Sequence, residues 1–285
     1  MKRNEEMNVK RIVCTLLSLV LAIGLLGGCG SKKAATDNAD SLSGSVSTNG
    51  STSMENVIGM LKEQFTNDHN GVTVSYDATG SGTGIESVSN GSCDIGLSSR
   101  KLKDSETGLT ATTIALDGIA VIAGSGCRVD NLTQQQIKDI FTGKITNWKD
   151  VGGADLTIAC VGRESSSGTR DGFESATGTK DACVLTQELT STGAVLEAVK
   201  NSSNAVGYAS FSSVTGKQGI KMLTVDGVAC QEETILNGSY AIQRPFNLVT
   251  KDGVTLSAAA QAFVDYATSK EAGDLIRRAG AVPIA

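Results

Sequence analysis

The stretch Gly80-Ser81-Gly82-Thr83-Gly84 follows a strand-like run and precedes a predicted helix. Two further stretches share its design, Gly50-Ser51-Thr52-Ser53 and Ser165-Ser166-Ser167-Gly168-Thr169. Each is rich in Gly, Ser and Thr, and each is predicted to open a helix, where N–H groups are unpaired and the helix dipole is positive. Glycine lets a guest approach the backbone closely, and the hydroxyls add donors. Three such helix starts that converge would form a site for a small oxyanion.

Two of these helix starts carry a capping-box pattern. Thr52 with Glu55, and Thr83 with Glu86, have the spacing of an N-cap hydroxyl and a glutamate three residues later. The third turn lacks the matching glutamate, so the helix that runs from it toward Phe173 rests on weaker evidence.

Apolar spacing along the rest of the chain alternates between the strand and the helix period. Strands are predicted at 72–76, 93–97, 118–123, 156–161 and 205–209, and helices at 54–65, 133–141, 195–200, 257–268 and 272–279. This alternation predicts α/β layers with mostly parallel sheets. Ligands in such sheets bind beyond the carboxyl ends of the strands, where the Ser/Gly-rich turns lie.

The N-terminal segment has the pattern of a bacterial lipoprotein signal. Lys10 and Arg11 precede Ile12–Leu26, an apolar run of 15 residues, whereas a membrane span needs about 20. Leu26-Gly27-Gly28-Cys29 resembles a lipobox, which predicts a signal peptide at 1–28 and lipidation at Cys29, with palmitate among the expected acyl groups. An ordinary secretion signal is the alternative, and Met7 is as plausible a start as Met1.

Residues 29–43 are polar and are predicted to form a flexible tether that holds the protein at the outer face of the cell membrane. Cleavage leaves 257 residues, enough for one large domain or two lobes. Four of the 25 basic and two of the 30 acidic residues are lost with the signal, so the mature net charge is −7. This excess of acidic residues argues against nucleic acid as a partner.

Five cysteines remain in the mature body, Cys93, Cys127, Cys160, Cys183 and Cys230. Because no two of them form a C-x-x-C pair, a zinc site is not expected. They are predicted to be small buried residues, with one disulfide bond possible.

Few residues in the sequence support an enzymatic function. The single histidine, His69, lies in a polar turn, so a Ser-His-Asp hydrolase lacks its base. There is no G-x-S-x-G motif and no nucleotide P-loop. Asp94 and Asp117 show no metal-ligand spacing, and Asp117-Gly118 is predicted to be a turn; no catalytic residue, metal or other cofactor is expected. A Ser-Lys arrangement of Ser98-Ser99 with Lys101 or Lys103 is the remaining alternative.

Arg163 directly precedes the third turn and would add a cationic fork suited to a tetrahedral oxyanion. The alternative is a surface salt bridge with Glu164. For each hydroxyl taken singly, plain capping is the simpler interpretation.

The chain resembles the phosphate-binding lipoproteins of ABC phosphate importers, a branch of the periplasmic-binding-protein superfamily, from about Leu42 to the C-terminus. The matching segments are Gly80–Ile85, Asp94–Arg100, Ile140–Trp148, Arg163–Thr169, Arg244-Pro245 and Gly280–Ile284. Ile140–Trp148 has no evident role with the anion, and a packed helix-turn is the preferred interpretation.

The resemblance implies a two-lobed α/β fold, each lobe a mostly parallel sheet flanked by helices, with two crossing strands near 119–123 and 241–248. Lobe I would comprise 44–120 and 246–285, and lobe II 121–245. The resemblance also implies that the anion lies between the lobes. Its expected contacts are Thr52, Ser53, Ser81, Ser99, Arg163, Ser167, Gly168 and Thr169.

The chain departs from the family at two positions. Acidic residues that accept the proton of hydrogen phosphate in some members correspond to Ser99 and Ser165 here. A serine can donate or accept, so strict selection of phosphate over sulfate is in doubt.

The expected function is therefore capture of inorganic phosphate outside the cytoplasm and its delivery to ABC permease subunits, by a monomer that is not an enzyme. The alternatives are a receptor for another oxyanion such as sulfate or tungstate, a serine phosphoesterase, and a phosphate sensor without a transport role.

Overall fold

The computed structural model describes residues 42–284. The predicted signal peptide (1–28), the predicted lipidation site Cys29 and residues 30–41 of the predicted tether lie outside the described residues. The strands are β1 (Ser43–Gly50), β2 (Gly71–Ala78), β3 (Ile95–Ser98), β4 (Leu109–Ala123), β5 (Asn131–Leu132), β6 (Ala159–Arg163), β7 (Gln187–Leu189), β8 (Ala205–Ser210), β9 (Lys221–Met222), β10 (Thr224–Val225), β11 (Gln243–Lys251) and β12 (Val282–Pro283). The α-helices are α2 (Glu55–Asp68), α3 (Ser81–Ser89), α4 (Gln134–Phe141), α5 (Gly168–Thr177), α6 (Thr192–Lys200), α7 (Phe211–Val214), α8 (Glu232–Leu236), α9 (Ala258–Ala267) and α10 (Lys270–Arg278), and the 3-10 helices are η1 (Thr52–Met54) and η2 (Trp148–Val151).

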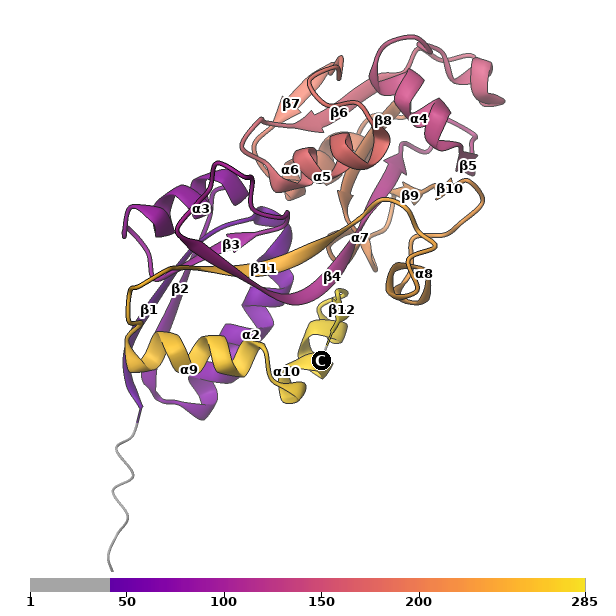
Figure 1. The fold of residues 1–285 in the computed structure, drawn as a ribbon. Helices are drawn as coiled ribbons and strands as arrows, with labels where there is room; N and C mark the ends of the chain where they lie inside the picture. The colour runs from indigo at the N-terminus through magenta and orange to yellow at the C-terminus, as the bar shows by residue number, and fades with distance from the viewer. Residues whose placement is uncertain (1–41, 285) are drawn as a thin grey trace, which may run out of the picture. The chain divides into compact units, whose positions relative to one another are not determined.

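The first lobe is built on β1, which pairs in parallel with β2 on one side and β3 on the other. Helices α2, α3 and α9 pack on this part of the sheet, and α10 packs against α2, α9 and β12 (Figure 1). Its core is a separate apolar cluster that includes Leu61, Phe65, Leu97 and Phe263. β1 begins at Ser43, so the strand includes the last residue of the predicted tether.

The second lobe is built on β6, which pairs in parallel with β7 and β8. Its larger apolar cluster includes Phe141, Trp148 and Tyr208. The ring of Phe173, from α5, stacks on that of Tyr208 at 4.0 Å, and the Trp148 indole N–H donates to the Asn204 carbonyl at 2.9 Å. The segment 140–148 is therefore the packed helix-turn that was expected.

β4 and β11 run antiparallel to each other between the two lobes (Figure 1). β11 also pairs with β3, and residues 119–123 of β4 pair with β8, so the two strands join both lobes into one continuous sheet. The pairing shifts register between Phe246 and Asn247. The prediction of two crossing strands is confirmed, but the prediction that Asp117-Gly118 forms a turn is wrong. Asp117 lies inside β4 and is fully buried, because it has a cationic partner on β11.

All three Gly/Ser-rich turns open helices as predicted, yet the two expected capping boxes are absent. η1 has Ser51 at its N-cap, whose hydroxyl makes no capping hydrogen bond, and α3 has Gly80, which has no side chain to cap it. The Thr52 hydroxyl is instead hydrogen-bonded to groups of the other lobe, and Thr83 lies within the first turn of α3. The third turn, whose helix had the weaker evidence, is the one that has a side-chain cap. The Ser167 hydroxyl accepts from the N–H groups of Thr169 and Arg170.

The five cysteines are free in the structure, so the disulfide bond that the sequence left possible does not form. Within residues 42–284, no helix has both the length and the apolar character needed to cross a membrane.

Candidate functional site

Buried hydroxyl groups from both lobes meet where the helices of the three turns begin. The Ser53 hydroxyl, in η1 of the first lobe, lies 2.7 Å from that of Thr169, in α5 of the second. The Ser81 hydroxyl lies 3.1 Å from that of Ser99, which follows β3. Each of these four residues is at most 1% exposed. We call the set Ser51, Thr52, Ser53, Ser81, Ser99, Thr169 and Thr192 the hydroxyl cluster.

Arg163, the last residue of β6, reaches the hydroxyl cluster from the second lobe. Its Nη1 donates to the Thr52 hydroxyl at 3.1 Å and to that of Thr192 at 3.3 Å. Its Nε and Nη2 donate to the carbonyls of Leu189 and Thr190, which fix the plane of the guanidinium. Burial lowers the pKa of Arg163, but an arginine keeps its charge in proteins.

The proposed surface pair of Arg163 with Glu164 is only partly correct. Nη2 of Arg163 lies 3.6 Å from Oε1 of Glu164, but the arginine side chain is only 2% exposed. Because the guanidinium is buried and directed at the hydroxyl cluster, a plain surface salt bridge does not describe it.

A second guanidinium, that of Arg244 on β11, was not among the predicted site residues. Its Nη1 donates to the hydroxyls of Ser99 at 2.9 Å and Thr169 at 2.8 Å. Its Nη2 is paired with the buried carboxylate of Asp117 at 3.0 Å. Arg244-Pro245 had been noted only as a matching segment, because no local pattern links it to residues 75 or more positions away.

Thr192 was also missed, although the sequence carried a signal for it. Ser191-Thr192-Gly193 is a fourth Ser/Thr/Gly turn, and it opens α6 with the Ser191 hydroxyl as N-cap. The Thr192 N–H donates to the Thr52 hydroxyl at 3.2 Å. Ser51, whose hydroxyl donates to that of Ser99 at 2.8 Å, belongs to the first turn but was not among the eight expected contacts.

Main-chain N–H groups at this site are partly engaged already. Ser81 and Gly168 are the first residues of α3 and α5, so their N–H groups have no acceptor within the helix. The N–H of Gly82 donates to the carbonyl of Ser166 at 2.9 Å, which joins the two lobes directly. Gly168 allows the close approach of the lobes, since a Cβ there would lie 2.3 Å from the Ser81 hydroxyl.

Ser99 and Ser165, the two positions at which the sequence was expected to depart from the family, have different locations. Ser99 lies within the hydroxyl cluster and Ser167 caps α5 beside it, whereas Ser165 is exposed and makes no contact with the cluster. Among the described residues, no carboxylate is hydrogen-bonded to the hydroxyl cluster. Asp117 is occupied instead by Arg244, Ser210 and the N–H of Ser212.

Residues that the enzyme alternatives would use make other contacts in the structure. His69 follows α2 and its ring packs against that of Phe65 at 4.7 Å. The Ser98 hydroxyl donates to the Arg100 carbonyl, and Lys103 pairs with Asp171, so neither forms a Ser-Lys pair. Within residues 42–284, no group of His, Cys, Asp and Glu could hold a metal ion.

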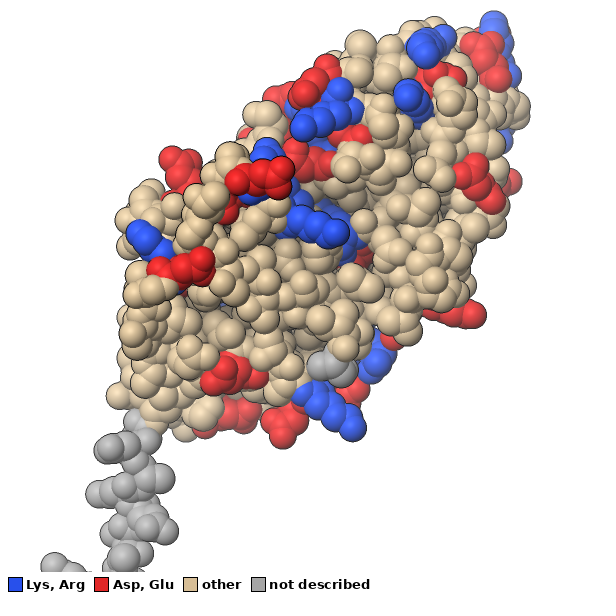
Figure 2. Space-filling model, viewed as in Figure 1, with Lys and Arg blue, Asp and Glu red and all other residues tan. Residues whose placement is uncertain are grey.

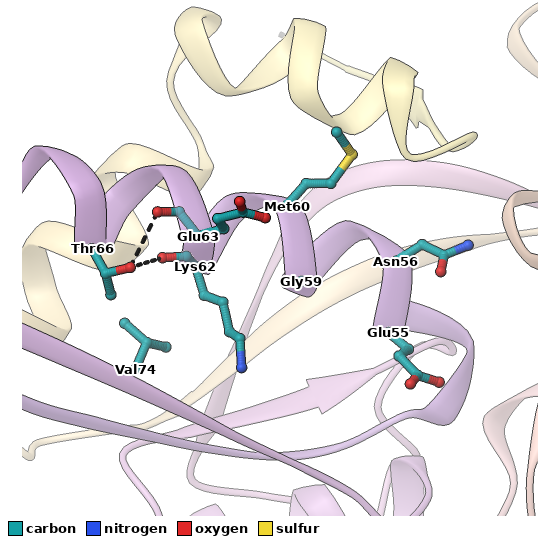
Figure 3. A pocket seen from close by; sticks show the side chains of 8 residues that line it. All are labelled: Glu55, Asn56, Gly59, Met60, Lys62, Glu63, Thr66 and Val74. Atoms are coloured by element: carbon teal, nitrogen blue, oxygen red, sulfur yellow. Dashed lines mark hydrogen bonds between the residues drawn. The ribbon is translucent and has the colours of Figure 1, made fainter.

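Two of the hollows in the described residues are larger than 400 Å³. One, of about 590 Å³, runs along α2 and is lined by Lys62, Glu63, Thr66 and Val74 among others (Figure 3). The Thr66 hydroxyl there donates to main-chain carbonyls of its own helix. The other, of about 460 Å³, lies between the lobes and is lined by Arg100, Lys103 and Arg244 among others. Acidic and basic side chains are interspersed over the face seen in Figure 2, and that face carries no extended patch of one sign.

A family model described as a PBP superfamily domain matches residues 35–271. The phosphate-binding protein PstS of Bacillus subtilis (strain 168) is 30% identical over 280 residues, which cover 95% of this chain and 91% of that protein. A structure of a phosphate ABC transporter substrate-binding protein from Clostridium perfringens, with bound phosphate, is 37% identical and superposes with a TM-score of 0.81 over 85% of this chain and all of that one. An ABC-type phosphate transport receptor from Vibrio cholerae is 32% identical, with a TM-score of 0.69 over 83% of this chain and 99% of that one. The chain therefore belongs to the PBP superfamily and, within it, to the family of the PstS proteins.

Proposed function

We propose that this protein is the phosphate-binding component of an ABC importer, which captures inorganic phosphate between its two lobes and delivers it to the permease subunits. The observation that carries the proposal is the hydroxyl cluster, which is buried between the lobes and approached by two guanidinium groups. Desolvated O–H and N–H donors together with fixed cations suit a tetrahedral oxyanion. The names of the relatives in Bacillus, Clostridium and Vibrio agree with this choice of ligand.

In this proposal Thr52, Ser53, Ser81, Ser99, Arg163, Ser167, Gly168 and Thr169 contact or frame the anion. Phosphate oxygens would replace the hydroxyl–hydroxyl contacts that join the lobes in the structure, those of Thr52 with Thr192 and of Ser53 with Thr169. The lobes would then open and close about β4 and β11, with boundaries near residues 120 and 245. No covalent chemistry is involved.

Calorimetric titration of phosphate into phosphate-free protein tests the ligand. We expect one phosphate per chain, and we expect Arg163→Gln to remove measurable binding while the circular-dichroism spectrum stays unchanged. Tighter binding of sulfate or tungstate than of phosphate would favour the other-oxyanion alternative. Turnover of a chromogenic phosphoester would favour an enzyme.

We further propose that the mature protein is a monomer anchored by lipid at Cys29 to the extracytoplasmic face of the cell membrane. The lipobox-like segment Leu26–Cys29 supports this proposal. The variant Cys29→Ser is expected to lose the membrane association that the wild type shows on cell fractionation. Retention of the variant in the membrane fraction would contradict the anchor.

A further inference from the structure

We propose that Arg244, positioned by Asp117, is a second cationic ligand of the bound anion and contacts it directly from the strands that join the lobes. The inference rests on the proposed function, since it concerns the same site. It assigns a ligand that neither the turn motifs nor the eight expected contacts include.

Nη1 of Arg244 points into the hydroxyl cluster. This nitrogen donates to the hydroxyls of Ser99 and Thr169, at 2.9 and 2.8 Å, and more weakly to the carbonyl of Ser99 at 3.3 Å. Ser99 belongs to the first lobe and Thr169 to the second, and both are members of the hydroxyl cluster. An anion held by these hydroxyls would therefore lie within reach of Nη1.

The carboxylate of Asp117 holds the guanidinium of Arg244 in position. Nε and Nη2 of the arginine both donate to Oδ2 of Asp117, at 3.2 and 3.0 Å. Asp117 in turn accepts from the Ser210 hydroxyl and from the N–H of Ser212. This arrangement uses one edge of the arginine for its position and leaves Nη1 for the cluster, as a ligand with low reorganisation cost requires.

Two buried cations lie at the hydroxyl cluster. Arg163 and Arg244 approach the cluster from different strands, and each is under 5% exposed. Burial lowers the pKa of Arg163, and the positive charge of Arg244 nearby adds to that lowering. Asp117 pairs with Arg244 at 3.0 Å, whereas the acidic neighbour of Arg163 is the more exposed Glu164, whose Oε1 lies 3.6 Å from Nη2. A buried cation that lacks a full partner is unfavourable, so an anion at the cluster would relieve the charge of both.

Arg244 differs from the other proposed ligands in its place in the fold. The other proposed ligands belong to one lobe or the other. Arg244 lies on β11 and Asp117 lies on β4, and these two strands connect the lobes. A cation fixed on the connecting strands would meet the anion whichever lobe binds it first. The interaction would therefore contribute to closure as well as to affinity.

The competing interpretation is that the Arg244–Asp117 pair only holds β4 against β11. A double-mutant cycle separates the two. Phosphate affinity is measured by calorimetry, and stability of the phosphate-free protein by thermal unfolding, for Arg244→Gln, Arg244→Lys, Asp117→Asn and the double variant Arg244→Gln/Asp117→Asn. Arg277→Gln, which alters an exposed arginine of α10, is the control.

If Arg244 is a ligand, Arg244→Gln weakens phosphate binding by about tenfold to a hundredfold, the effect of one charge-assisted hydrogen bond. Arg244→Lys keeps the charge and regains part of the affinity. Asp117→Asn weakens binding in the wild-type background but adds little when Arg244 is already glutamine. Arg277→Gln leaves the affinity unchanged.

Two results would overturn the inference. Phosphate affinity of Arg244→Gln within twofold of the wild type, with only the unfolding temperature lowered, would assign the pair a structural role. Asp117→Asn lowering affinity equally in both backgrounds would show that the carboxylate does not act through Arg244. In either case Arg163→Gln would still abolish binding, so the proposed function would stand; absence of phosphate binding by the wild type would instead contradict the proposed function itself.

Discussion

Nε of Arg100, just after β3, lies 2.8 Å from the carboxylate of Asp171 in the first turn of α5. The arginine belongs to the first lobe and the aspartate to the second, so an ion pair joins the lobes beside the hollow that Arg244 also lines. The other edge of the same guanidinium forms two hydrogen bonds with Glu106, at 2.8 and 2.7 Å. Arg100 is therefore held in place by its own lobe before it contacts the other.

This ion pair is predicted to slow the release of phosphate. Because Asp171 is partly exposed, its contribution should be that of a surface pair, about 0.5–1 kcal/mol, so Asp171→Asn should speed dissociation about two- to fivefold. Stopped-flow dissociation measures this rate. Asp274→Asn, which breaks an exposed pair within α10, is the control, and an Asp171→Asn rate equal to that of the control would refute the role.

The ion pair between Glu106 and Arg100 is predicted to lose its stabilising effect in acid. Burial by itself would raise the pKa of Glu106, but hydrogen bonds from Arg100 and from the Lys103 N–H lower it below its ordinary value of 4.5. A carboxyl with a lowered pKa stabilises the fold above its ordinary pKa, and that contribution is lost as the pH falls through the lowered value. Glu106→Gln should therefore be less stable than the wild type at pH 7, and the difference should shrink below pH of about 4. Urea unfolding at both pH values measures it, and a gap that stays constant would contradict the ion pair.

Gly168 predicts a steric limit on closure. A methyl group there would lie 2.3 Å from the Ser81 hydroxyl and 2.7 Å from that of Ser99. Gly168→Ala should thus weaken phosphate binding strongly while the protein still folds. Gly59→Ala, in α2, has no atom within 4 Å of the added methyl group and is the matched control; it should bind as the wild type and gain slightly in stability, by up to about 1 kcal/mol. Equal affinities of the two variants in calorimetry would show that the lobes do not close on Gly168.

The cysteines are predicted to be unreactive in the folded protein. Burial raises the pKa of Cys93 and Cys183 to about 11 and that of Cys160 to about 12. The thiolate is the reacting form, so little of it exists at pH 8. Titration with a thiol reagent at pH 8 should give slow labelling before unfolding and rapid labelling after it. Fast labelling of Cys160 in the folded state would contradict its burial.

Much of the fold follows from local sequence patterns. The run 118–123 is apolar throughout because that part of β4 is buried on both faces. The start of α4 was predicted from its spacing, and Thr133 caps it with Gln136. The two wrong capping boxes have one cause in common: the hydroxyl of Thr52 is used between the lobes, and Thr83 is already inside its helix.

The candidate site was predictable only in part. Arg163 and the three Gly/Ser-rich turns carry a local signal, since each combines a strand end with a helix start. Arg244 and Asp117 do not, because their contact joins residues 127 positions apart on two strands. The sequence offered only an aspartate beside an apolar run, Asp117, and an arginine before a proline, Arg244. That these two residues form a pair is seen only in the three-dimensional structure.

The central claim is that donors of both lobes surround a single tetrahedral anion. The most direct measurement is an anomalous difference map from crystals grown with arsenate, a phosphate analogue whose arsenic atom can be located independently. The account predicts one arsenic peak within hydrogen-bonding reach of Ser53, Ser81 and Thr169, with Nη1 of both Arg163 and Arg244 on its oxygens. A peak elsewhere on the protein, or ordered crystals with no peak at saturating arsenate, would contradict it.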